Sequence, residues 1–165
     1  MDSEYFPAPF GQFAGEVRRE WIDSNGHMNL AYYIVLFDEG SELFFEALGY
    51  GPAYRTAHNH GPYAVETHTL YQRELLAGAR VRVTSQLLAA DAKRLHVAYE
   101  MFCAEDSARA ACQEVLYLNV DLAARRVTPF APGLQERIGA AMTAHLQLPR
   151  PAWVGRHVGM APSKE

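Results

Sequence analysis

The sequence has few cysteines and few basic residues, and each shortage excludes a class of protein. Only two of its 165 residues are cysteines, Cys103 and Cys112. Both fall in strand-like segments, which indicates reduced packing residues rather than a disulfide framework. Lysine and arginine total 15 against 19 aspartates and glutamates, which leaves a formal net charge of -4. We therefore expect no nucleic-acid partner, because a phosphate backbone favours a basic surface.

Membrane and export signals are also missing. No segment approaches the roughly 18 consecutive apolar residues of a membrane span. The start, Met1-Asp2-Ser3-Glu4, is acidic where a signal peptide is basic. With 49% hydrophobic and 12% aromatic residues, the chain can still bury the core of one domain. These features predict a cytoplasmic protein with no membrane partner.

The order of predicted elements indicates an α+β fold. Apolar alternation and helical periodicity predict a strand over 13–22, a helix over 30–48, strands over 63–75, 80–90, 94–104 and 110–122, and a short helix over 132–146. Short turn-like joins between the later strands imply antiparallel neighbours, which could curl as a sheet around the long helix. We place the domain at 13–148, between a lead-in over 1–12 and an extended tail over 149–165.

The polar loop before the long helix carries the densest chemistry. Asp23, Asn25, His27 and Asn29 occupy every second position before the apolar run that starts at Leu30. A helix needs one capping residue, and Asn29 suits that role. Amides near Asn29 and Leu30 would then lie unpaired at the positive end of the helix, where they could hold a carbonyl oxygen that gains charge. The loop therefore predicts an active site.

These and later residues resemble those of a known family, the hot-dog thioesterases, which include bacterial 4-hydroxybenzoyl-CoA thioesterases and plant acyl-carrier-protein thioesterases. The similarity extends over about residues 13–130 and rests on Asp23-x-x-Gly26-His27-x-Asn29, Tyr33, Asp38-Glu39, Tyr71-Gln72-Arg73-Glu74-Leu75 and Gly78. It implies a hot-dog fold, an antiparallel five-stranded sheet wrapped round one long central helix. It also implies hydrolysis of acyl-CoA thioesters, at a site between the two chains of a homodimer or of a dimer of dimers.

One position departs from the family pattern. Many bacterial members carry a carboxylate two residues before the position of Asp23, and here that residue is Trp21. The plant enzymes instead have an Asp-x-Asn-x-His set that matches Asp23, Asn25 and His27, with an acidic residue that matches Glu74. We therefore infer the roles of Asp23, Asn25, His27 and Glu74 from their resemblance to the plant pattern.

Thioester hydrolysis requires an activated water and a stabilised oxyanion. We expect His27 and a carboxylate to activate the water while Asn25 orients the water or the acyl group. The carboxylate is Asp23, Glu66 or Glu74. Glu66 and Glu74 share strand parity, and the apolar neighbours of Glu66 predict a desolvated side chain suited to act as a base.

The substrate and the metal question rest on other residues. The Thr67-His68 region and the segments 119–121 and 127–130 are similar to short betainyl-CoA thioesterases of carnitine breakdown, which implies a small cationic acyl group. Aromatic side chains could contact such a group through cation–π interactions or could simply be core residues: Tyr32, Tyr33, Phe37 and Tyr71. His58 and His60 lack a cysteine or carboxylate at a metal-binding spacing, so we expect no metal.

The remaining expectations concern CoA. CoA is part of the substrate, so no separate cofactor is expected, and its phosphates would meet arginines such as Arg55, Arg73, Arg80 or Arg94.

Two other functions stay open. Because position 21 lacks a carboxylate, the chain could be a non-catalytic acyl-CoA-binding hot-dog protein. A hot-dog dehydratase or hydratase is the second, although the usual Asp, Asn-Pro and His arrangement of that class is not present.

Overall fold

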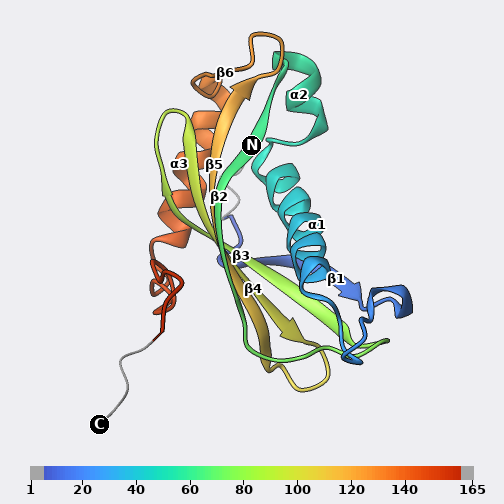
Figure 1. Ribbon diagram of the computed structural model, residues 1–165. Coiled ribbons are helices and arrows are strands. Elements are labelled where there is room, and N and C mark those ends of the chain that lie inside the picture. Colours follow the sequence, from blue (N-terminus) through green and yellow to red (C-terminus); the bar gives the residue numbers. More distant parts are fainter. Residues whose placement is uncertain (1–5, 161–165) are drawn as a thin grey trace.

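An antiparallel sheet curves past one long helix in the computed structural model, which describes residues 6–160 (Figure 1). The strands are β1 (Phe10–Glu16), β2 (His60–Tyr71), β3 (Arg80–Ala90), β4 (Arg94–Cys103), β5 (Arg109–Asp121) and β6 (Arg126–Val127). Their order is β1-β3-β4-β5-β2, and the two-residue β6 pairs with β5. The helices are α1 (Leu30–Leu48), α2 (Pro52–His58) and α3 (Pro132–His145), and a 3-10 turn, η1, spans Arg19–Trp21. The predicted α+β architecture of five long strands around one helix is confirmed.

Helix α1 begins and ends where its capping residues predict. The Asn29 side-chain oxygen accepts a hydrogen bond from the Ala31 amide at 3.0 Å. At the other end Gly49 adopts a φ of +79°, and its amide donates to the Glu46 carbonyl at 2.9 Å. Left-handed backbone at this position favours glycine. Both ends of the helix are thus determined by local sequence.

The sheet covers only one side of α1. Phe37 and Phe44 are buried against it, but Ile34, Val35 and Leu43 are exposed on the other side. The curled sheet therefore packs along one side of α1 and leaves the opposite side open in a single chain. These apolar side chains are spread around the open side of α1, with exposed Asp38, Glu42 and Glu46 among them.

Helix α3 takes the place of β1 along the upper half of β3. Strand β1 pairs with β3 only as far as Ser85, and beyond that point the Leu87 amide donates to Nδ1 of His145 at 2.7 Å. The other ring nitrogen of His145 lies 2.9 Å from the Pro7 carbonyl oxygen. Burial lowers the pKa of His145, although the contact with Pro7 opposes that effect. A neutral ring with its proton on Nε2 satisfies both contacts.

Two further features complete the fold. Trp153 follows α3 and is buried with Leu88, Ala98 and Cys112 on the face of the sheet that points away from α1. The segment predicted as an extended tail thus includes a residue that packs on the sheet. Among residues 6–160, no helix combines the length and the apolar character needed to cross a bilayer.

Candidate active site

The polar loop folds as a tight turn that leads directly into α1. Ile22 and Met28 form an antiparallel bridge across its base, and the Asp23 amide donates to the His27 carbonyl at 3.1 Å. Within the turn, Oδ1 of Asp23 accepts from the Asn25 amide at 2.8 Å. Asp23, Asn25 and His27 are therefore brought together in one turn, as the sequence predicts.

The first amides of α1 differ in availability. The Asn29 amide already donates to the Trp21 carbonyl at 2.9 Å, and the Ala31 amide donates to the Asn29 side chain. The Leu30 amide donates to no other group within residues 6–160. Of the two amides expected to hold an oxyanion, that of Leu30 is the one left available.

The segment that follows β2 is anchored to this helix start. The Met28 amide donates to the Leu75 carbonyl at 2.8 Å, and the Tyr33 hydroxyl donates to the Arg73 carbonyl at 2.9 Å. Glu74 lies between these two anchored residues, and its side chain is exposed. Two contacts that link distant parts of the chain thus bring Glu74 to the start of α1.

Aromatic side chains line the same region. The rings of Tyr33 and Tyr71 pack edge to face with centroids 5.2 Å apart, and Tyr71 is 45% exposed. Burial raises the pKa of Tyr33. A backbone contact of Leu75 opposes this, and the charge of Glu74 raises the pKa further. The Tyr33 hydroxyl therefore stays protonated and acts as a donor.

Glu66 lies away from this region. It pairs in register with Leu116 on β5 and lines a cleft of about 580 Å³ on the face of the sheet that points away from α1. Strand β2 ends at Tyr71, so strand parity does not relate Glu66 to Glu74. The Glu66 side chain is exposed rather than desolvated, because β2 is an edge strand in this chain. Within one chain, the structure separates Glu66 from Asp23 and His27.

Trp21 is a packing residue. The Trp21 side chain is 6% exposed, and the indole ring stacks on the Tyr32 ring with centroids 5.0 Å apart. The guanidinium of Arg18 lies 4.9 Å from the ring centroid. Because the ring is buried against an aromatic and a cationic neighbour, this position supports the core under the loop. Asp23 and Glu74 are the carboxylates that the chain itself supplies at the helix start.

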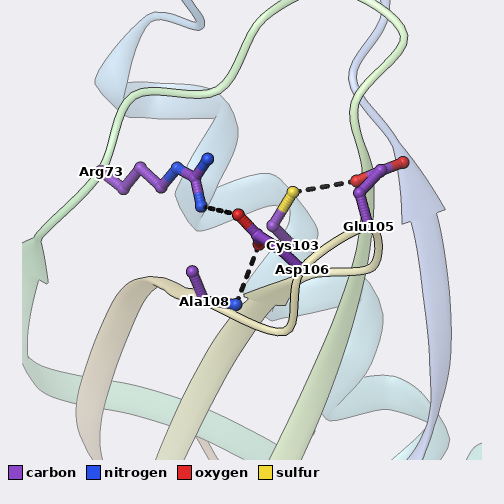
Figure 2. A network of polar contacts seen from close by, with 5 residues as sticks. All are labelled: Arg73, Cys103, Glu105, Asp106 and Ala108. Atoms are coloured by element: carbon purple, nitrogen blue, oxygen red, sulfur yellow. Dashed lines mark hydrogen bonds and ion pairs between the residues drawn. The ribbon is translucent and has the colours of Figure 1, made fainter.

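The arginines expected near nucleotide phosphates are mostly engaged in ion pairs. Figure 2 shows Arg73 donating to Asp106, whose other oxygen accepts from the Ala108 amide. Three ion pairs involve the predicted arginines: Arg73 with Asp106, Arg80 with Glu105, and Arg94 with Asp91. Arg55 lies exposed on α2.

No three His, Cys, Asp or Glu side chains within residues 6–160 converge on a metal-sized site.

The arrangement at the start of α1 can polarise a carbonyl and activate water. Nδ1 of His27 lies 3.4 Å from the Met28 carbonyl oxygen. A proton on Nδ1 leaves Nε2 with the lone pair that can accept a proton from water. The Leu30 amide lies at the positive end of α1, where it can hold a developing oxyanion. The contacts of the Arg73 and Leu75 carbonyls with α1 and the loop were not predicted from the sequence. The family-like segment 71–75 was the only feature that could have pointed to them.

Comparisons with known proteins place the chain in a family. The thioesterase-like superfamily matches residues 17–138, a range that includes the whole loop, α1 and Glu74. A betainyl-CoA thioesterase from Pseudomonas aeruginosa is 34% identical over 143 residues, which are 87% of this chain and 90% of that protein. An L-carnitine dehydrogenase/betainyl-CoA thioesterase from Rhizobium meliloti is 33% identical over 144 residues, 87% of this chain but only 29% of that longer protein.

Solved structures show the same architecture. A hypothetical protein from Staphylococcus aureus, solved in complex with CoA, superposes with a TM-score of 0.83 at 25% identity and covers 94% of this chain and 99% of its own. A 1,4-dihydroxy-2-naphthoyl-CoA thioesterase from Synechocystis superposes with a TM-score of 0.69 at 17% identity, over 86% of this chain and 100% of its own. The second likeness shows the fold alone.

Proposed function

This chain belongs to the thioesterase-like superfamily, and on that premise we infer that it hydrolyses acyl-CoA thioesters to a free acid and CoA. The single observation that carries the site is the Leu30 amide, which has no partner within residues 6–160, directly after the turn that holds Asp23 and His27. CoA enters as part of the substrate, and the proposal includes no separate cofactor.

In the mechanism that we propose, the Leu30 amide donates to the thioester oxygen and stabilises its negative charge after attack. A water oxygen attacks the carbonyl carbon while His27 or a carboxylate takes a proton from that water. The tetrahedral intermediate then collapses, the carbon–sulfur bond breaks, and the CoA thiolate regains the proton. Asn25 orients the water or the acyl group.

Glu74 is the carboxylate that we assign as the base. Oδ1 of Asp23 already accepts from the Asn25 amide, so Asp23 has a part in holding the turn. The Glu74 carboxylate forms no ion pair within residues 6–160 and is held beside the helix start by its anchored neighbours. Glu66 is assigned no role in the site of its own chain, because it lies in the outer cleft.

A second copy of the chain completes the site in this proposal. Strand β2 is an edge strand of 12 residues, and two of its apolar side chains, Tyr63 and Val65, are exposed. A long exposed strand edge is a surface for pairing. Pairing of two β2 edges would also bring cover to the exposed side of α1, where Ile34 and Val35 lie. We therefore propose a homodimer, and Val65→Lys should shift it toward monomer in size-exclusion chromatography with light scattering.

We propose that the acyl group is small and cationic. Support comes from the betainyl-CoA thioesterase relative and from the half-exposed Tyr71 ring beside Tyr33. A quaternary ammonium over an aromatic face gains about 0.5–2 kcal/mol. In a betainyl group the ammonium lies two bonds from the carbonyl carbon, so a carboxylate placed at the reacting carbon, such as Glu74, is also near the ammonium.

Thiol release measured with a panel of acyl-CoA thioesters tests both parts of the proposal. The matched pair is betainyl-CoA and 3,3-dimethylbutyryl-CoA, which have the same shape but differ in charge. We expect faster release from betainyl-CoA and loss of that preference in Tyr71→Leu. Equal rates for the pair would overturn the cationic substrate. Binding of acyl-CoA without thiol release would favour the non-catalytic binder, and hydration of an enoyl-CoA without release would favour the hydratase.

Variants of the two glutamates test the assignment of the base. Glu74→Gln keeps the size of the side chain but cannot accept a proton, so kcat should fall by roughly two orders of magnitude or more. Glu66→Gln is the matched control and should leave kcat unchanged. The opposite result, with loss confined to Glu66→Gln, would show that the base comes from β2, most simply from that of the second copy.

A further inference from the structure

The chain beyond α3 folds back over the face of the sheet that points away from α1. Trp153 is 6% exposed, and its indole N–H donates to Oε1 of Glu100 on β4 at 3.1 Å. The Gly155 amide donates to Oε2 of Glu114 on β5 at 2.6 Å. The segment 149–156 is therefore fixed to two strands by a buried aromatic ring and two hydrogen bonds to carboxylates.

A cleft of about 650 Å³ lies between this segment and the sheet. Thr84 and Ala98 of the sheet contribute to its lining, as does Trp153, and Arg150 and Arg156 flank Trp153 along the chain. Gln86 on β3 adds a further contact by donating to the Pro149 carbonyl at 3.3 Å. The volume falls in the range of about 300–1,000 Å³ that is usual for small-molecule sites.

The cleft carries an excess of positive charge. Its charged side chains are three arginines, Arg109, Arg150 and Arg156, against the single carboxylate of Glu100. That carboxylate is already engaged, because its Oε1 accepts from both Arg109 and the Trp153 indole. The cleft is thus locally positive although the formal net charge of the chain is -4.

The three arginines divide into one that is held and two that are available. Nε of Arg109 donates to the Gln72 side chain at 2.7 Å, while its guanidinium also contacts Glu100. Arg150 and Arg156 form no ion pair with any carboxylate of residues 6–160. Guanidinium groups bind phosphate oxygens through paired hydrogen bonds. Arg73, Arg80 and Arg94, by contrast, are each paired with an acidic residue.

We propose that this cleft binds a phosphate-bearing anion, with Arg150 and Arg156 supplying the charge and Arg109 held in position by Glu100 and Gln72. Two sources share this chemistry: the nucleotide end of CoA, and a free phosphate compound. The first rests on the proposed function, and the second does not. Gln72 follows Tyr71 directly, so the cleft and the aromatic wall of the acyl site lie near the same end of β2.

Calorimetric titration of the full chain with 3′,5′-ADP and with inorganic phosphate tests binding. We expect the double variant Arg150→Gln/Arg156→Gln to lose roughly tenfold or more in affinity, because each charge-assisted hydrogen bond carries about that much. The matched control is Arg125→Gln/Arg126→Gln, which removes the same charge from the end of the β5–β6 turn and the start of β6 and should bind like wild type. Equal affinity in all three proteins, or no binding of either anion by wild type, overturns the proposal.

A second arm distinguishes the two sources. S-acyl-pantetheine carries the thioester but no nucleotide. If the cleft holds the nucleotide end of CoA, the arginine double variant raises KM for acyl-CoA by roughly tenfold, with kcat unchanged and KM for S-acyl-pantetheine unaltered. If it holds a free anion, neither KM changes although the titration still shows the loss. A chain that releases no thiol from any substrate would overturn the proposed function and leave the titration result intact.

Discussion

The hydroxyl of Tyr33, in the first turn of α1, donates a hydrogen bond to the backbone carbonyl of Arg73, 2.9 Å away. The two residues lie on separate elements, so this bond ties the helix start to the segment that carries Glu74. The Met28 amide reinforces the link by donating to the Leu75 carbonyl at 2.8 Å. The position of Glu74 relative to the Leu30 amide therefore depends on two bonds, one from a side chain and one from the backbone.

Tyr33→Phe removes the side-chain bond with little change in shape. We expect the free energy of unfolding to fall by about 1 kcal/mol and kcat to fall because Glu74 is less well held. Tyr32→Phe is the control, since the Tyr32 hydroxyl has no hydrogen-bond partner within residues 6–160. Urea unfolding and thiol release measure the two effects. An unchanged kcat in Tyr33→Phe would mean that the backbone bond alone positions Glu74.

The cap of α1 offers a second test. Asn29→Ala removes the acceptor of the Ala31 amide, and loss of an N-cap costs about 1 kcal/mol of stability. Asn29→Asp keeps an acceptor and adds a negative charge that the helix dipole favours, so its stability should match that of wild type. Denaturation midpoints that fall equally in both variants would show that the cap contributes through something other than its acceptor oxygen.

Stability should depend on pH through His145. Burial holds the pKa of His145 below its usual 6.5 in the folded state. As the pH falls through 6.5, His145 binds a proton in the unfolded chain but not yet in the folded chain. The free energy of unfolding therefore decreases as the solution becomes more acidic. Thermal unfolding between about pH 8 and about pH 5.5 should show this loss in wild type. His145→Gln should unfold at a lower temperature throughout but with a flatter pH dependence, and parallel curves would contradict the assignment.

Close packing of α1 on β3 can be tested with a pair of glycines. A Cβ on Gly40 would lie 3.1 Å from a methyl of Val83, whereas a Cβ on Gly139 in α3 would meet nothing within 4 Å. We expect Gly40→Leu to lower the free energy of unfolding by about 1–3 kcal/mol, since added volume displaces the helix from the sheet. Gly139→Leu should leave it unchanged or raise it, because leucine is the better helix former. Similar unfolding midpoints for the two variants would refute the close contact.

Several features of the site were predictable from sequence because they are local. Helix α1 begins after Asn29 and ends before Gly49, as capping chemistry predicts, and the turn through Asp23 and His27 forms as expected. Others were not. The Asn29 amide is occupied by the Trp21 carbonyl, and nothing in the residue pattern of the loop indicates that bond. The ion pairs of Arg73 with Asp106 and of Arg80 with Glu105 join residues 33 and 25 positions apart, so they too depend on tertiary pairing, whereas Arg94 pairs with Asp91 only three residues before it.

The amino-acid sequence by itself determined the long helix, its two ends, the polar turn before it and the antiparallel sheet, because periodicity, caps and short joins act over a few residues. Only the tertiary structure decided which carboxylate reaches the helix start. Strand β2 ends at Tyr71, where its pairing with β5 stops, and this end point sends Glu74 toward α1 while Glu66 stays on the outer face. The ends and faces of a strand are set by pairing between distant segments. The sequence alone therefore does not distinguish the positions of two glutamates such as Glu66 and Glu74.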